Sequence, residues 1–81
     1  FADVVTRLWE EVERGGVVEL HIEGGSVILP KWFERRLSGG THALFASQAV
    51  DGTVTLTAVA WDSIQRIVVR NVGDLPDGMF E

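Results

Sequence analysis

Hydrophobic and polar residues alternate with two different periods along this chain. In the first fourteen residues the apolar positions recur every three or four residues, which is the spacing of one face of a helix. That face consists of Phe1, Val4, Val5, Leu8, Trp9 and Val12. Gly15 and Gly16 follow and predict the end of the helix. We therefore expect an amphipathic helix over residues 1–14 that lies as a lid over the rest of the fold.

After this helix the apolar positions alternate with a period of two, which predicts β-strands. A Gly24-Gly25 pair suits a two-residue hairpin turn between the first two strands. Pro30 has no N–H group to donate, so the second strand must end, bulge or lie at a sheet edge there. Residues 38–40 predict a flexible loop. The first three strands are expected at residues 17–23, 26–29 and 42–50.

A hairpin near the end of the chain gives the strongest strand pattern. Asp51-Gly52 predicts a tight turn with positive φ, and Val54, Leu56 and Ala58 then share one face of a fourth strand. A short polar break follows, in which we expect Asp62 to cap a turn by accepting main-chain hydrogen bonds. A final strand, rich in β-branched residues, is expected over residues 64–72.

Length and charge narrow the class of protein. Eighty-one residues form one small domain, which buries only about 60% of the surface of its unfolded chain and is marginal alone. The chain contains no cysteine, so disulfides are excluded and oligomerisation is the expected source of further stability. A formal net charge of −5 repels nucleic acid and acidic membranes unless a local basic patch opposes it.

Signals for catalysis, cofactors and membranes are lacking in the sequence. No nucleophile elbow, phosphate loop or dinucleotide glycine pattern is present, so we expect a non-enzymatic protein without a cofactor. Glu19, His21 and Glu23 share one strand face and could present metal ligands, but such residues are typical of a solvated face and we expect no metal. No apolar run could span a membrane, and the first residues lack the basic region followed by an apolar region of a signal peptide, so a cytoplasmic location is expected.

The only basic patch of the chain lies at Lys31, Trp32, Arg35 and Arg36. These four residues are candidate contacts for single-stranded nucleic acid, because aromatic rings stack on bases and cations bind phosphates. In the alternative, Trp32 belongs to the core or to a subunit interface and the cations pair with acidic side chains. The sequence leaves open whether this segment continues the second strand or forms a helical turn.

Two segments resemble the conserved motifs of the Sm-like family, which includes bacterial Hfq. Residues 60–67 look like the second Sm motif, a polar turn before an isoleucine-rich last strand, and residues 25–28 resemble part of the first motif. The residues of the second motif-like turn are Trp61, Asp62, Ser63 and Ile64. The resemblance implies a mainly β, strongly bent, five-stranded Sm-like (SH3-like) barrel over residues 17–72, within a single domain that ends in an acidic tail at residues 73–81.

The family resemblance also implies assembly and a ligand. Sm-like proteins form closed rings, here expected to hold about five to seven copies, in which the fourth strand of one subunit pairs with the fifth of the next. RNA binds around the pore of such rings. Trp61 and Asp62 stand where Hfq-like proteins have a basic pair, so RNA binding is expected to be weak. The chain would fit among the small phage-borne or uncharacterised bacterial members.

We therefore expect a non-enzymatic, ring-forming module with weak RNA binding. The alternative is an oligomeric interaction or scaffold module whose partner is another protein and which has no role with nucleic acids.

Overall fold

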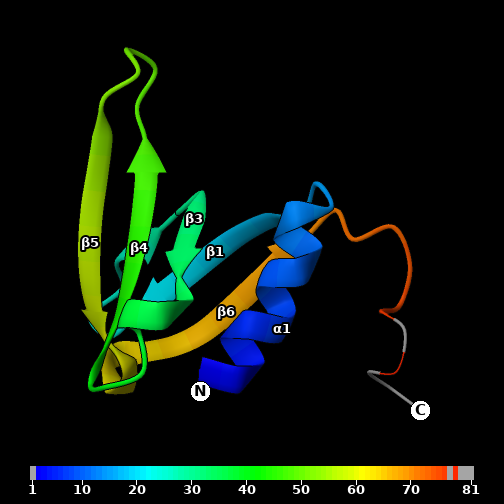
Figure 1. The fold of residues 1–81 in the computed structure, drawn as a ribbon, viewed down its shortest axis with the longest axis horizontal. Coiled ribbons are helices and arrows are strands. Elements are labelled where there is room, and N and C mark those ends of the chain that lie inside the picture. The colour runs from blue at the N-terminus through cyan, green and yellow to red at the C-terminus, as the bar shows by residue number, and fades with distance from the viewer. Residues whose placement is uncertain (1, 77, 79–81) are drawn as a thin grey trace.

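The computed structural model describes residues 2–76 and 78, which form one helix and six strands (Figure 1). The helix α1 spans Ala2–Glu13. The strands are β1 (Val17–Ile22), β2 (Val27–Ile28), β3 (Trp32–Glu34), β4 (His42–Gln48), β5 (Val54–Ala60) and β6 (Ile64–Arg70). Two 3₁₀ turns, η1 (Arg35–Leu37) and η2 (Trp61–Ser63), follow β3 and β5. Part of the predicted acidic tail, at residues 77 and 79–81, lies outside the described residues.

The strands form two antiparallel sheets, ordered β2-β1-β6 and β3-β4-β5. The expectation of a mainly β fold with an N-terminal helix is confirmed. The described residues contain six strands rather than the expected five, because the second strand ends before Pro30 and a separate short strand begins at Trp32. No ladder joins the two sheets within the described residues, so the expected closed barrel is not observed.

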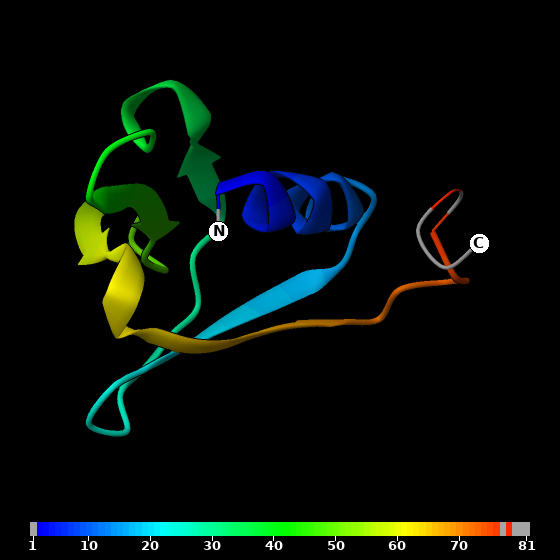
Figure 2. The same cartoon turned by 90° about the horizontal axis from the view of Figure 1, so that it is seen from below.

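A proline elbow connects the two sheets. β2 belongs to one sheet and β3 to the other, and the three residues between them turn the chain through buried Pro30. Pairing resumes directly after the proline, since Lys31 N donates to Ala46 O at 2.8 Å. The elbow therefore makes β2 and β3 two arms of one bent segment, and the sheets lie at an angle to each other in Figure 2.

The turn between β4 and β5 forms as predicted. Gly52 has a φ of 89°, a conformation that favours glycine, and Ala49 N donates to Thr53 O at 2.9 Å. The Asp51 carboxylate accepts hydrogen bonds from the Thr53 hydroxyl at 2.7 Å and from the Thr53 N–H at 3.0 Å. These two bonds, led by the hydroxyl, hold the pKa of Asp51 below its ordinary value.

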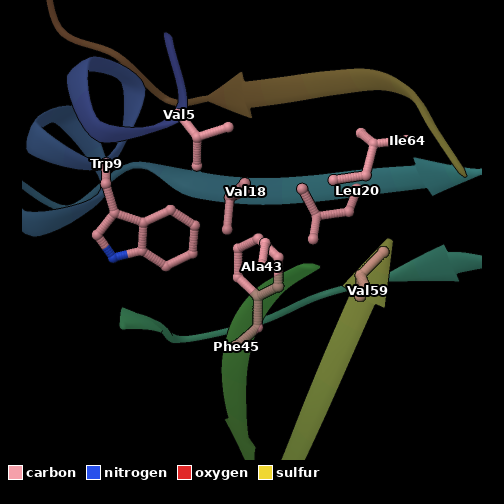
Figure 3. Packing of buried hydrophobic residues seen from close by; sticks show 8 residues of the cluster. All are labelled: Val5, Trp9, Val18, Leu20, Ala43, Phe45, Val59 and Ile64. Atoms are coloured by element: carbon pink, nitrogen blue, oxygen red, sulfur yellow. The ribbon is translucent and has the colours of Figure 1, made fainter. Parts of the chain in front are cut away.

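The hydrophobic core lies between the helix and the inner faces of both sheets (Figure 3). Trp9 from α1 sits 5.7 Å from Phe33 and 5.8 Å from Phe45, measured between ring centroids. Close aromatic pairs of this kind add to the stability that apolar burial gives. The buried apolar residues are Val5, Trp9, Val18, Leu20, Ala43, Phe45, Val59 and Ile64. Each secondary structure element longer than three residues contributes to this cluster.

Ser38 is a buried polar centre in the segment that was expected to be a flexible loop. Its side chain donates to Glu34 O at 2.6 Å and accepts from Leu44 N at 2.9 Å, and only 1% of the residue is exposed. Its carbonyl accepts from Trp61 Nε1 at 3.0 Å. Ser38 thus fixes the connection between η1 and β4, so the expectation of flexibility is wrong at this residue.

Candidate assembly interface

The segment from Lys31 to Arg36 is first a strand and then a 3₁₀ turn, so it combines the two conformations that the sequence left open. Trp32 faces outward on β3 and is 47% exposed, whereas Phe33 faces the core. The Lys31 ammonium lies 5.9 Å from the centre of the Trp32 ring, within the range of a cation–π contact. The structure therefore brings together two of the four candidate nucleic-acid contacts.

The two arginines of this segment lie in η1, directly after β3, and both have acidic neighbours. Arg36 pairs with Glu34, with Nε 3.6 Å from Oε1 of the carboxylate, and its main-chain N–H donates to the same oxygen. Arg35 lines a small cleft together with Glu10 and Glu13 of α1, on the side of β3 that faces the helix. Acidic neighbours therefore accompany both guanidinium groups. These acidic side chains offset part of the positive charge of the candidate nucleic-acid site, and RNA binding stays a prediction.

The turn that resembles the second Sm motif is mainly a packing element. The Trp61 indole is 6.2 Å from the Phe33 ring in an edge-on arrangement, and Ile64 is buried at the start of β6. The Ser63 hydroxyl donates to Ala60 O at 2.7 Å. Asp62 is exposed and lies within the turn rather than before it, so no side chain caps η2 and the expected capping role of Asp62 is wrong.

A polar network covers the outer face of β1 and β6. Arg70 Nε donates to Glu19 Oε2 at 2.7 Å, and His21 Nε2 lies 3.1 Å from the other carboxylate oxygen. The Arg70 hydrogen bond is the main cause that lowers the pKa of Glu19, with His21 second. Arg66 lies on the far side of the ring, 3.5 Å from Nδ1 of His21. Glu19 and His21 therefore have protein partners across the two strands.

The structure adds two observations about absent features. In residues 2–76 and 78, no group of three or more histidine or acidic side chains lies close enough to hold a metal ion. No helix in the same part of the chain has the length and apolar character needed to cross a membrane.

Two long sheet edges are open in the structure. β5 pairs only with β4, and β6 pairs only with β1, as far as the described residues show. Each of these edge strands has seven residues. The other two edge strands, β2 and β3, have two and three residues and meet at Pro30. In Figure 1, β5 lies at the outer side of its sheet. The open hydrogen-bonding capacity of the fold is thus concentrated on β5 and β6.

The hydrogen bonds of the ladder show which main-chain groups point outward from β5. Thr53 bonds to Ala49 across the hairpin, and alternate residues of an antiparallel strand bond to the same side. The odd-numbered residues of β5 therefore bond to β4. The N–H and C=O groups of Val54, Leu56 and Ala58 point to the open edge.

The same argument applies to β6. Ile22 N donates to Ser26 O, so the even-numbered residues of β1 bond toward β2 and the odd-numbered ones toward β6. Glu19 and His21 pair with Val68 and Arg66. The even-numbered residues of β6 therefore bond to β1. The main-chain groups of β6 that point to the open edge are those of the odd-numbered positions 67 and 69.

The composition of the β5 edge differs from that of a protected edge. Monomeric proteins commonly protect long edges with lysine, proline, bulges or very short strands. β5 has the sequence Val-Thr-Leu-Thr-Ala-Val-Ala, which includes neither charge nor proline, and its pairing with β4 has no bulge. The sequence pattern predicted this strand but not its edge position, which depends on the strand order. No family model, curated protein or solved structure matches this chain, so its function is inferred from its own residues.

Proposed function

We propose that this chain is a non-enzymatic, self-assembling module in which the open edge of β5 in one copy pairs with the open edge of β6 in the next. The observation behind the proposal is that both edges are seven residues long and unpaired in the described residues. A contact between two different edges is head-to-tail. Repetition of such a contact gives a ring when the rotation between copies closes.

The outward main-chain groups of the two edges allow a ladder between copies. Residues 67 and 69 of β6 present four such groups, which allow about four main-chain hydrogen bonds, each worth about 0.5–1.5 kcal/mol net. A junction of this kind therefore contributes on the order of 5 kcal/mol before the cost of association. That is comparable to the whole stability of a small domain, at about 0.05–0.15 kcal/mol per residue.

Side chains on the two strands are compatible with this pairing. Arg66 and Arg70 lie on the outer face of β6, where Arg70 is paired with Glu19. β5 is uncharged, so no like charges would be placed opposite each other in the new ladder.

The resemblance to Sm-like proteins supports a ring of about five to seven copies. The element order supports the same conclusion. When β2 and β3 are counted as one bent strand, the fourth strand, β5, lies at one end of the strand order and the last strand, β6, lies at the other. β2 lies in the predicted second strand, and β3 lies in the segment after Pro30 for which the sequence left a continuation of that strand open. An interaction module without a role in nucleic-acid binding fits this proposal equally well, since the assembly does not require Lys31 or Trp32.

Light scattering on a sizing column, run over a dilution series, tests the proposal. We expect a closed species of about five to seven copies, or a stack of such rings, that survives dilution. Ala58→Pro removes one N–H from the open edge and leaves the ladder with β4 intact, so it should reduce the assembly. Ala58→Val keeps that N–H and serves as the matched control. A parent chain that shows no edge-dependent assembly would refute the proposal.

A further inference from the structure

The outer face of the β3-β4-β5 sheet is apolar across all three strands. The ladder places Trp32, Ala46 and Leu56 in one row and Glu34, Leu44 and Ala58 in the next. Val54 continues this face toward the hairpin, and Leu37 of η1 stands at its rim. We call this surface the outer apolar face. It is distinct from the edge used for the proposed assembly, because it consists of side chains rather than main-chain groups.

Large apolar side chains on this face are unusually exposed. The exposed fractions are 47% for Trp32, 53% for Val54, 70% for Leu56 and 70% for Leu37. At these exposures the four side chains present on the order of 500 Å² of apolar surface, and the largest patch on a typical monomer covers about 300–600 Å². A cleft of about 260 Å³ lies within the patch, between Trp32, Leu37 and Leu56.

Charge indicates what kind of partner this face accepts. Glu34 is the only charged residue within it, and Arg36 already neutralises that carboxylate at 3.6 Å. The face therefore presents no unpaired charge, and an apolar surface of the same kind can cover it without burying an isolated ion. Nucleic acid would find the Lys31 ammonium near Trp32 and an Arg36 guanidinium that is already paired with Glu34, on a chain with a net charge of −5.

We infer that a second copy of this chain docks on the outer apolar face, related to the first by a two-fold axis. Such an axis brings the same patch of both copies together, which suits a mainly apolar face whose one carboxylate, that of Glu34, is already paired with Arg36. The cleft beside Trp32 then receives an apolar side chain from the other copy. This contact leaves the open edges of β5 and β6 free, so it goes beyond the proposed ring and does not depend on it.

The available area sets the strength of this contact. Two copies docked face to face bury on the order of 1,000 Å² in total, near the minimum of about 1,000 Å² for a specific interface. A single pair is therefore weak. In a ring every copy presents the face in the same direction relative to the axis, and repeated weak contacts strengthen each other when several can form together.

Three variants separate this contact from edge pairing. Leu56→Glu places a carboxylate on the face and keeps the main-chain N–H of the edge. Thr55→Glu adds the same charge one residue earlier, on the opposite side of the strand, and is the matched control. Leu37→Glu repeats the test from η1, where the side chain is 70% exposed and its replacement should not impair folding.

Light scattering over a dilution series is the readout, with circular dichroism to verify folding. We expect Leu56→Glu and Leu37→Glu to halve the mass of the parent species or to weaken its association about tenfold, while Thr55→Glu leaves both unchanged. The edge variant Ala58→Pro should still form dimers. If the proposed ring is wrong but this inference holds, the parent is a dimer and Leu56→Glu is a monomer.

Two results would overturn the inference. The first is a parent mass that persists in both face variants. The second is an Ala58→Pro chain that stays monomeric at every concentration and is correctly folded. A single-stranded oligonucleotide that binds the parent, loses affinity in Leu56→Glu and causes no change in mass would assign the face to nucleic acid instead.

Discussion

Replacing Ser38 by alanine removes one hydroxyl group and leaves two main-chain groups without their partner. The Ser38 hydroxyl lies 2.6 Å from Glu34 O and 2.9 Å from Leu44 N, and the residue is 1% exposed. Water cannot reach so buried a site without rearrangement, so the two groups lose their hydrogen bonds outright. An unsatisfied buried polar group costs about 1–3 kcal/mol. We therefore expect Ser38→Ala to lower the free energy of unfolding by about 2–4 kcal/mol.

This loss is large for a chain of 81 residues, whose total stability is about 0.05–0.15 kcal/mol per residue. Urea unfolding followed by tryptophan fluorescence is the suitable assay, because Trp9 is buried in the core and changes environment on unfolding. Protein concentration must be held constant between variants, since assembly adds to apparent stability. The urea dependence of unfolding should not change, because the same surface is exposed in both chains.

Ser26→Ala is the control, since Ser26 is exposed in the turn before β2. We expect it to change the free energy of unfolding by less than about 0.5 kcal/mol. The reasoning about Ser38 is refuted if Ser38→Ala falls within the same range while the urea dependence stays constant. That result would mean that Leu44 N–H and Glu34 C=O find other partners when the hydroxyl is absent.

Three further predictions concern the turn after the helix, the polar network and the basic segment. Gly16→Ala should destabilise the chain by about 1–3 kcal/mol in thermal or urea unfolding, because a Cβ there would lie 2.8 Å from a main-chain oxygen of the helix. Glu19 has a pKa lowered from 4.5 in the folded chain, so its ion pair stabilises the fold above that pH and is lost as the pH falls through the folded value. Melting temperatures measured from about pH 3 to 7 should therefore fall less steeply at the acid end in Glu19→Gln than in the parent, and parallel curves would contradict this. Combined Arg35→Ala and Arg36→Ala should change the affinity for a single-stranded RNA oligonucleotide less than about threefold, because acidic side chains accompany both arginines. A slope of log affinity against log salt that drops by the equivalent of about two phosphate contacts in this variant would contradict the prediction.

Much of the fold follows from local patterns in the sequence. The helix and the tight turn at Gly52 result from short-range preferences that neighbouring residues determine. Pro30 predicts a break in the second strand, since it lacks a donor. The short separate strand that begins at Trp32 results from pairing of the chain with β4 directly after the proline elbow. The alternation of apolar and polar residues alone does not predict this pairing.

Other features depend on which surfaces the tertiary structure covers. Alternation places Val54, Leu56 and Ala58 on one face of β5, but it does not say whether that face is inside. The structure exposes it, because the helix packs against the other face, from which Val59 enters the core. Trp32 and Arg35 are likewise close in sequence, yet Trp32 faces outward on β3 while Arg35 lines a cleft on the side of the helix, because η1 turns the chain between them.

The connection between η1 and β4 explains why Ser38 was not predicted as a central residue. Its sequence neighbours, Gly39 and Gly40, are typical of a loop, and nothing nearby indicates that Leu44 and Trp61 will close around it. A serine before two glycines is common in exposed connections. Only contacts between distant positions give this serine its partners.

The pairing of β1 with β6 sets the order in which this protein can fold. Val17 lies opposite Arg70, so the first strand completes its ladder only with the last one. Contacts so distant in sequence form slowly, whereas the β4–β5 hairpin needs only its own turn. During synthesis the first strand therefore has to wait until β6 has left the ribosome, and until then its apolar face is open to chaperones and to other unfinished chains.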